Sequence, residues 1–440
     1  MLTVAYLANQ YPVVVEPYVD EEIEALRRHG VRVITGTVSR VQGCTRRPDI
    51  ALRPVRPVLF MRALWLCVQR WSRISSLVVR GLLHGTEGPL RRIKSLLHTL
   101  LGACYAVELR GYEVDHLHVH HGFSAAWVAM IASRLLGVDF SMTLHGSDLL
   151  LHRVYLDVKL ENCKFCLTIS EYNRTFLLQH YPAIPPSKVF VTRLGVEIPE
   201  IETWDATRTQ DAAEPLRMLA VGRLHAVKNH AFLIQACARL RVLGMHFCCK
   251  IAGEGPEHPR LESLVRGLRL ENNVLLLGHS SREQIDSLYR EADLLVLTSL
   301  SEGLPLVLME AMARAKIVLA PAITGIPELV VPGKTGLLYE PGSMTDFTEQ
   351  VIKISSLLRK GRGMGEKASH ESRSRQDNER ALRPDPACRL DWIRHAARVQ
   401  VSHNFNKERN LQFFVDLFLR HASPSRTKDL PYACSVLQQI

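Results

Sequence analysis

Residues 293–310 read Asp-Leu-Leu-Val-Leu-Thr-Ser-Leu-Ser-Glu-Gly-Leu-Pro-Leu-Val-Leu-Met-Glu, and they contain a complete strand–turn–helix unit. The apolar run from Asp293 to Thr298 predicts a buried strand, and a helical segment follows through Ala315. Gly303 lets the backbone approach a ligand closely. Pro305 suits a first helical position because its ring fixes φ and its missing N–H is not needed there. Such a unit predicts an anion site at a helix N-terminus.

Two carboxylates frame this turn. Glu302 lies in the loop and Glu310 lies inside the predicted helix. Carboxylates are hydrogen-bond acceptors, so they suit hydroxyl groups and do not bind phosphate themselves. The pairing therefore predicts a ligand that has both a phosphate part and a sugar part.

Length and composition favour a globular protein of two domains. The 440 residues exceed one ordinary core, and 47% apolar with 22% charged residues is typical of soluble proteins. Residues 1–8 lack a basic region and a cleavage site, so we expect a first buried strand rather than a signal peptide. The ten cysteines are irregularly spaced, which predicts a reducing cytoplasm.

The net charge of +11 is concentrated in part of the chain. Residues 51–110 contain ten Lys or Arg against Glu87 and Glu108, together with Trp65 and Trp71. Basic amphipathic helices bind anionic lipid surfaces, although a solvated face on a core helix fits the same pattern. We expect an anionic partner and no nucleic acid, because no nucleic-acid module is apparent.

Strand-like and helix-like segments alternate in both halves of the chain. This predicts an α/β fold of two Rossmann-like doubly wound domains that face each other across a cleft. Strands are expected at residues 3–8, 31–35, 116–120, 140–144, 166–169, 189–192, 217–221, 246–251, 274–277, 294–298 and 317–320.

Composition also predicts the domain boundaries. Residues 197–215 are polar and proline-bounded, and we interpret them as a linker between an N-terminal domain, 1–196, and a C-terminal domain, 216–395. Within the latter, residues 359–385 predict a disordered insertion. Residues 396–440 are expected to form a C-terminal amphipathic helix and tail.

A second phosphate-type motif follows an earlier strand. Gly222 lets the backbone turn, and Arg223 and Lys228 place two cations near a helix start. Lone surface cations are often only solvated, so that alternative stays open. Gly253 and Gly255 either shape a nucleotide pocket or form an ordinary turn.

Other motifs leave two interpretations. We expect that Gly325 is needed first for the geometry of a turn and only second for contact with a ligand. His145 ends a strand in the first half, where a functional and a structural role are both open, and Asp148 is expected to cap the next helix. His116, His118 and His120 share one strand face, but no cysteine or carboxylate near them completes a ligand set, so no metal is predicted.

Together these motifs resemble the group 1 (family 4) retaining glycosyltransferases of the GT-B fold, of the polysaccharide-assembly type. The resemblance is strongest over residues 216–347 and looser before them. The motifs that carry it are Gly222-Arg223-x4-Lys228, Gly253-Glu-Gly-Pro256, Ser301-Glu302-Gly-Leu-Pro305 with Glu310, Gly325-Ile-Pro-Glu-Leu-Val330, Tyr11-Pro-Val-Val-Val-Glu16, His118-Val-His120, Thr143-Leu-His145-Gly146 and Thr168-Ile-Ser-Glu171.

The resemblance implies roles for individual residues. Arg223 and Lys228 would neutralise a donor diphosphate, Glu302 would contact donor-sugar hydroxyls, Glu310 would bind ribose hydroxyls, and His145 would reach the sugar from the other domain. The implied catalytic set is His145, Arg223, Lys228 and Glu302. The implied donor-binding set is Gly222, Gly253, Gly255, Gly303, Leu304, Glu310 and Gly325. No metal or other cofactor is implied, because cations and helix dipoles neutralise the diphosphate. The last helix would cross back onto the first domain.

The implied function is transfer of a hexose-type sugar from a nucleotide-diphosphate donor to a hydroxyl acceptor with retention. The acceptor would be a glycan or lipid-linked glycan in exopolysaccharide, lipopolysaccharide or other cell-surface glycan synthesis. The enzyme would be cytoplasmic and peripheral on the inner face of the cell membrane through residues 51–110. The alternatives are a nucleotide-sugar epimerase of the same fold and a non-catalytic membrane-surface adaptor. His121 departs from the family, whose members often carry Phe there.

Overall fold

The computed structural model describes residues 1–11, 16–40, 47–83, 87–200, 214–365 and 386–423. The chain divides into two compact units. Unit one contains residues 1–192 together with 411–440, and unit two contains residues 193–410.

Unit one is built on a seven-stranded parallel sheet with the order β3-β2-β1-β4-β5-β6-β7. The strands are β1 (Thr3–Tyr11), β2 (Arg32–Arg40), β3 (Ile50–Ala51), β4 (His116–His120), β5 (Asp139–Leu144), β6 (Cys166–Thr168) and β7 (Val189–Val191). The helices are α1 (Pro17–Arg28), α2 (Pro57–Gln69), α3 (Trp71–Leu83), α4 (Pro89–Leu109), α5 (Ser124–Leu136), α6 (Ser147–Leu150), α7 (Leu156–Asn162) and α8 (Glu171–His180).

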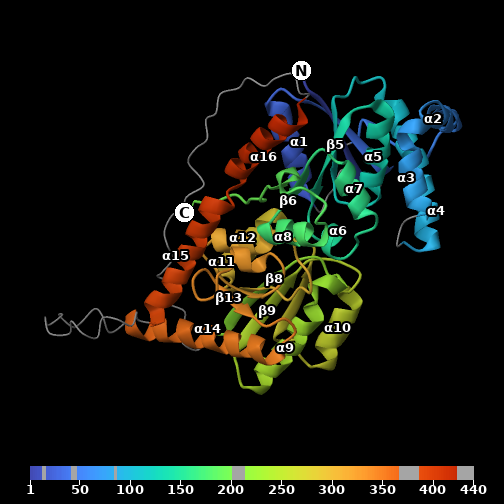
Figure 1. The fold of residues 1–440 in the computed structure, drawn as a ribbon. Coiled ribbons are helices and arrows are strands. Elements are labelled where there is room, and N and C mark those ends of the chain that lie inside the picture. Colours follow the sequence, from blue (N-terminus) through green and yellow to red (C-terminus); the bar gives the residue numbers. More distant parts are fainter. Residues whose placement is uncertain (12–15, 41–46, 84–86, 201–213, 366–385, 424–440) are drawn as a thin grey trace. The chain divides into compact units, whose positions relative to one another are not determined.

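Helices α4 and α5 form the main core on one face of this sheet (Figure 1). Helix α5 is apolar on nearly all sides, which is the pattern of a fully buried helix. Gly102 lets α4 approach it, because a Cβ there would lie 2.7 Å from the Cβ of Ile131. Exposed parts of α2, α3 and α4 lie outside this core.

The C-terminal helix α16 (Lys407–Ala422) completes the opposite face of unit one. From Leu411 onward it belongs to this unit. Phe414, Val415 and Phe418 are buried there in one cluster with Tyr6 of β1 and Ile23 of α1. The predicted return of the last helix to the first domain is therefore confirmed.

Unit two repeats the plan with a six-stranded parallel sheet in the order β10-β9-β8-β11-β12-β13. Its strands are β8 (Leu216–Val221), β9 (Phe247–Ala252), β10 (Val274–Gly278), β11 (Leu294–Val296), β12 (Ile317–Pro321) and β13 (Leu337–Tyr339). Its helices are α9 (His230–Val242), α10 (His258–Gly267), α11 (Arg282–Glu291), α12 (Leu306–Ala313), α13 (Ile326–Leu329), α14 (Met344–Gly365) and α15 (Pro386–Asn404). The predicted α/β class with two doubly wound parallel sheets is confirmed.

Some segment predictions need correction. Residues 359–365 belong to α14, so this part of the predicted disordered insertion is helical, while 366–385 lie outside the described residues. Of the predicted linker 197–215, residues 201–213 also lie outside them. Within the described part of the chain, no helix is long and apolar enough to cross a lipid bilayer.

Candidate functional site

The carboxyl ends of the strands in unit two bring the predicted motifs together. Strand β8 lies between β9 and β11, and all three run parallel, so their following loops meet at one edge of the sheet. The amide of Leu224 donates to the carbonyl of Glu254 at 2.7 Å. The amide of Leu300 donates to the carbonyl of Val227 at 2.8 Å. The loops after β8, β9 and β11 therefore form one connected surface.

Gly253 and Gly255 are required by this contact between loops. Both have φ in the left-handed half of the map, +149° and +155°. A Cβ at Gly253 would lie 2.0 Å from the carbonyl oxygen of Gly222, and one at Gly255 would lie 2.3 Å from that of Leu224. These glycines allow the loop after β9 to pack directly on the loop after β8.

Lys228 and Glu302 form an ion pair at this edge. The Nζ of Lys228 lies 2.6 Å from Oε1 of Glu302, and the two side chains are only 20% and 10% exposed. Thr324 supports the same loop, because its hydroxyl donates to the carbonyl oxygen of Glu302 at 2.5 Å. Arg223 is exposed, and within the described residues its side chain makes no hydrogen bond or ion pair. The site thus holds one paired and one unpaired cation.

Helix α12 begins directly after this loop. Pro305 is the N-cap residue and Leu306 the first helical residue, one position later than predicted. In the first turn the amide of Leu308 donates to the carbonyl oxygen of Pro305 at 3.1 Å, while the amides of Leu306 and Val307 have no backbone partner within the described residues and are available to an anion. Gly303 is partly exposed and Leu304 is buried. Gly325 has an ordinary φ of −80° and precedes the four-residue helix α13, so its backbone conformation does not require glycine.

Glu310 is held by a residue that sequence reasoning missed. The hydroxyl of Tyr289, on α11, donates to Oε2 of Glu310 at 2.8 Å. Burial raises the pKa of Glu310, while Tyr289 and Arg314 partly offset that rise. Arg314 lies over the Tyr289 ring, 5.1 Å from its centroid, and pairs with Asp286. Tyr289 engages one carboxylate oxygen of Glu310 and leaves the other for a ligand.

In unit one, Asp148 organises the loops that follow β4 and β5. Its carboxylate accepts hydrogen bonds from the amides of His145, Gly146 and Gly122, at 3.1, 2.9 and 2.9 Å. Asp148 itself lies inside α6, whose N-cap residue is Gly146, and none of the three amides belongs to a residue of that helix. The predicted helix-cap role of Asp148 is therefore wrong. Burial alone would raise the pKa of Asp148, but His121 and the backbone amide of Gly146 hold it well below its usual range.

Lys159 completes the support of the β4 loop from α7. Its Nζ donates to the carbonyl oxygens of Gly122 and Val154, at 2.7 and 2.6 Å. Burial lowers its pKa to about 7, against the opposing effect of Asp148. The positions of Gly122 and His145 are therefore set by a buried acid and a buried amine.

His121, the departure from the family pattern, is a partly buried cation whose side chain is 13% exposed. Its Nε2 lies 2.9 Å from Oε2 of Glu16, and its Nδ1 lies 3.6 Å from Oδ2 of Asp148. Burial would lower the pKa of His121, but the two carboxylates raise it to about 10. The residue also has a positive φ of 66°. A phenylalanine could make neither ion pair.

The histidines of β4 bond mainly to other side chains of the sheet. Ser141 Oγ lies 2.7 Å from Nε2 of His116 and 2.8 Å from Nδ1 of His118. Thr143 Oγ1 lies 3.0 Å from Nε2 of His118. Glu22 of α1 lies beside His118 and His120, so the expectation that no carboxylate is near them is wrong. Both ring nitrogens of His118 nevertheless already have hydroxyl partners.

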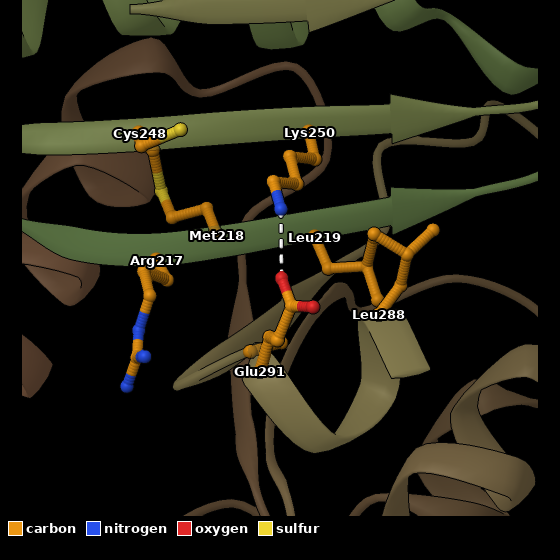
Figure 2. Close-up of a pocket in the computed structure, with 8 residues that line it drawn as sticks. Arg217, Met218, Leu219, Cys248, Lys250, Leu288 and Glu291 are labelled. Atoms are coloured by element: carbon orange, nitrogen blue, oxygen red, sulfur yellow. Dashed lines mark hydrogen bonds and ion pairs between the residues drawn. The ribbon is translucent and has the colours of Figure 1, made fainter. Parts of the chain in front are cut away.

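A further hollow in unit two is separate from the predicted site (Figure 2). Across it, Nζ of Lys250 pairs with Oε2 of Glu291 at 2.7 Å. The residues that line it are Arg217, Met218, Leu219, Cys248, Lys250, Leu288, Glu291 and Ala292. It lies along the amino-terminal half of β8, and none of the predicted site residues lines it.

Comparison with known proteins finds a family model that matches part of the chain. Residues 205–371 match the model described as glycosyl transferases group 1. The match covers the segment that contains the strand-end motifs of unit two.

The curated relatives of the chain are distant. A putative colanic acid biosynthesis glycosyltransferase from Salmonella typhimurium is 34% identical over 179 residues, 39% of this chain and 43% of the relative. The N-acetyl-alpha-D-glucosaminyl L-malate synthase of Bacillus anthracis is 28% identical over 58% of this chain and 69% of its own. An amylovoran biosynthesis glycosyltransferase from Erwinia amylovora is 28% identical over 58% of this chain and 65% of its own. The chain thus spans between 43% and 69% of the lengths of these relatives.

Solved structures share the fold over nearly the whole chain. Sucrose-phosphate synthase from Thermosynechococcus elongatus is 18% identical with a TM-score of 0.68, over 96% of this chain and 99% of that one. The Anabaena protein HepE, crystallised with UDP-glucose, is 18% identical with a TM-score of 0.64, over 96% of this chain and 100% of that one. These likenesses confirm the GT-B fold of the chain.

The structure brings together most but not all of the predicted site. Gly222, Lys228, Gly253, Gly255 and Glu302 meet at one sheet edge of unit two. His145 belongs to unit one. Sequence reasoning missed Tyr289, Thr324, Lys159 and Glu22, each of which supports a predicted residue or loop from a distant segment. An amphipathic helix such as α11 makes Tyr289 look like an ordinary core residue, so no local signal marks it.

Proposed function

We propose that this chain transfers a sugar from a nucleotide-diphosphate donor to a hydroxyl acceptor with retention of configuration. The observation that supports this most strongly is the Lys228–Glu302 ion pair at the sheet edge, directly before the N-terminus of α12. A cation and free amides suit a diphosphate, while the carboxylate suits sugar hydroxyls. Few ligands other than a nucleotide-diphosphate sugar need a cation with free amides and a carboxylate at one place.

Each predicted residue then has a defined role in donor binding. Arg223 is exposed and unpaired in the described structure, so it is available to a phosphate. Lys228 has three N–H donors and can bond Glu302 and a phosphate oxygen together. Glu310 offers ribose the carboxylate oxygen that Tyr289 does not use. The crystallised complexes of HepE with UDP and with UDP-glucose make UDP-glucose the first donor to examine.

The proposed reaction needs no protein nucleophile. The bond between the anomeric carbon and the leaving phosphate oxygen breaks as the acceptor hydroxyl attacks from the same face. The acceptor proton passes to the leaving phosphate oxygen. Arg223, Lys228 and the first-turn amides of α12 stabilise the negative charge that develops on the diphosphate. These groups do the work that a metal ion does in other transferases, so we propose that the reaction needs no metal or other cofactor.

Release of nucleotide diphosphate tests this function directly. The full-length protein is incubated with a panel of nucleotide sugars that begins with UDP-glucose, and the released UDP or other nucleoside diphosphate is quantified. We expect release from at least one donor, increased by a suitable glycan acceptor. No release from any donor would contradict the enzyme and favour the adaptor.

We also propose a cell-surface glycan as the destination of the sugar. The relatives from Salmonella and Erwinia are described by the synthesis of colanic acid and amylovoran. An acceptor of that kind is a growing or lipid-linked glycan at the inner face of the cell membrane. The enzyme would then act in the cytoplasm as a peripheral membrane protein.

The surface of α2, α3 and α4 supports the membrane part of this proposal. Twelve large apolar side chains on these three helices are exposed, about half of the exposed large apolar side chains in the described chain. They are Val58, Phe60, Met61, Trp65, Val68, Trp71, Val79, Leu83, Leu90, Ile93, Leu96 and Leu97. Arg62 and Lys94 lie exposed among them. Apolar and aromatic side chains beside basic ones match an anionic lipid surface.

Vesicle flotation tests this lipid-binding surface. Glutamate at both Trp65 and Trp71, which are 63% and 50% exposed, should lower binding to vesicles with anionic phosphatidylglycerol by about tenfold or more. The matched control is Trp392→Glu, on an equally exposed tryptophan of α15 in unit two, which should bind as the wild type does. Wild-type protein that floats with neither anionic nor neutral vesicles would contradict the membrane proposal.

A further inference from the structure

Unit one contains a cluster of buried polar side chains for which the proposed roles have no use. The cluster consists of Glu22 on α1 together with His118 and His120 on β4. One carboxylate oxygen of Glu22 and one ring nitrogen of each histidine all lie within 4.8 Å of one another. The three residues are 5%, 0% and 2% exposed, respectively. The fold thus brings three atoms of the kinds that bind metal ions together from two distant segments.

Glu22 and His120 face each other without a hydrogen bond. Oε2 of Glu22 lies 3.1 Å from Nε2 of His120, yet neither atom has a hydrogen-bond partner within the described residues. Buried polar atoms are nearly always paired, so two unpaired atoms side by side point to a shared third partner. Two ligand atoms that each lie about 2.0–2.1 Å from a tetrahedral zinc ion are about 3.3–3.4 Å apart, which is close to the observed distance.

A bound cation would also balance the charge of Glu22. Buried carboxylates are normally paired with a cation or coordinated to a metal ion. In the described part of the chain, Glu22 makes no ion pair with a lysine or an arginine. His121, the cation that follows His120, is already paired with Glu16 and Asp148. A divalent ion would therefore supply the missing positive charge.

The outer contacts of the two histidines suit metal binding as well. A histidine ligand binds the ion through one ring nitrogen and bonds a protein group through the other. Nδ1 of His120 lies 2.9 Å from Nε2 of His145. The hydroxyls of Ser141 and Thr143 lie 2.8 and 3.0 Å from the two ring nitrogens of His118. One of these hydroxyl contacts therefore remains when the other nitrogen of His118 binds an ion.

Tyr6 of β1 contributes a further unpaired polar atom beside this cluster. Its hydroxyl is buried and has no hydrogen-bond partner among the residues that the structure describes. Its ring centroid lies 4.8 Å from that of His118 and 5.7 Å from that of His120. Burial, and then the charge of Glu22, raise the pKa of Tyr6, so the phenol keeps its hydrogen. A water in the fourth position of a tetrahedral ion would give this hydroxyl a partner.

We propose that Glu22, His118 and His120 bind a divalent transition-metal ion, and that Zn²⁺ is the ion that fits them best. Two imidazoles and a carboxylate are one of the ligand sets that zinc takes in proteins. The ion would join α1 to β4, so its binding would stabilise the folded unit. The site is separate from the proposed donor-binding residues of unit two and does not depend on them.

Cobalt-substituted protein tests this site. Cells that produce the full-length protein without a histidine tag are grown in minimal medium with Co²⁺ in place of Zn²⁺, because ligands this deeply buried take up their ion as the chain folds. Tetrahedral Co²⁺ absorbs visible light strongly, whereas octahedral Co²⁺ on surface histidines absorbs it weakly. We expect one Co²⁺ per chain with the tetrahedral bands, and X-ray absorption that shows two imidazole ligands. The absence of these bands, or a different number of imidazole ligands, would overturn the proposal.

Variants of the ligands assign the ion to these residues. Glu22→Gln and His120→Gln should each contain at least about tenfold less Co²⁺, because even the loss of an outer partner weakens metal affinity by about 10- to 100-fold. The matched control is Glu24→Gln on the same helix, whose exposed side chain lies near Arg27 and which should hold as much Co²⁺ as the wild type. Wild-type Co²⁺ content in Glu22→Gln that keeps the native circular dichroism spectrum would overturn the proposal. Where a variant does not fold, the X-ray absorption of the wild type decides.

Discussion

At the scale of single residues, the candidate site depends on pairs that meet only in the folded chain. Tyr289 and Glu310 lie 21 positions apart, and Lys228 and Glu302 lie 74 apart. The sequence predicted Glu310 of the first pair and both residues of the second pair as ligand contacts, from their places at the end of a strand or the start of a helix. It did not predict Tyr289 or the Lys228–Glu302 contact, because helical periodicity and strand ends say nothing about which distant side chains meet.

Removing the Tyr289 hydroxyl tests the proposed ribose contact. Tyr289→Phe should weaken binding of UDP by about 3- to 10-fold, because Glu310 loses a hydrogen bond of about 1–1.5 kcal/mol that holds its carboxylate in place. Glu310→Ala should weaken it at least as much, and the double variant should add little. Isothermal titration calorimetry with UDP measures all three. Unchanged affinity in Glu310→Ala would remove its proposed ribose role.

His121 predicts a pH-dependent contribution to the stability of unit one. Its folded-state pKa of about 10 lies above the ordinary histidine value, so its stabilisation is complete below about pH 6.5. It declines by up to about 1.4 kcal/mol per pH unit as the pH rises toward 10. The difference in unfolding free energy between wild type and His121→Phe should therefore be larger at pH 6 than at pH 9.

Urea unfolding at pH 6, 7.5 and 9 gives that difference. Taking the difference between the two proteins cancels the opposite trend of Lys159, whose pKa is lowered. Glu16 and Asp148 have lowered pKa values, so their stabilisation is present at these pH values and is lost only in acid. A difference that does not change with pH would show that His121 is not a cation in the folded protein.

At the scale of elements, strands and helices were predictable where their composition is distinctive. Strands β8 and β12 are mostly apolar and buried runs of six and five residues, and β4 and β5 alternate apolar residues with His, Ser or Thr; single-sequence patterns detect both kinds well. The edge strands β3 and β13 were missed because they contain only two and three residues. Residues 359–365 were misread because their composition of Arg, Lys and Gly shows no helical periodicity, although α14 extends to Gly365.

The loops after β8 and β9 give a prediction at this scale. Gly253→Ala should destabilise the protein by about 1–3 kcal/mol through its positive φ alone, and the clash with the Gly222 carbonyl should displace the β8 loop. The affinity for UDP should fall as the β8 loop is displaced. The control is Gly267→Ala at the end of α10, where a Cβ would meet no atom within 4 Å. Thermal unfolding and UDP titration measure both effects, and wild-type behaviour of Gly253→Ala would contradict the described packing of the two loops.

At the scale of the whole molecule, family and fold were predictable from the order of motifs along the chain. Gly222, Gly253, Glu302 and Gly325 each follow a parallel strand, and parallel strands place such residues at one sheet edge whatever lies between them. The same logic cannot reveal the buried cluster around His145, because Glu22 joins it from a helix 98 positions before His120.

The central claim is that the Arg223–Lys228 motif supports transfer by neutralising the donor diphosphate. The most direct measurement is nucleotide-diphosphate release by the double variant Arg223→Glu/Lys228→Glu, with the donor that the wild type accepts. The control is Lys334→Glu, on an exposed lysine of the same unit. We predict that the double variant keeps the circular dichroism spectrum of the wild type and loses at least about 1,000-fold in rate, while the control keeps full activity. Near-normal release by the folded double variant would contradict the account.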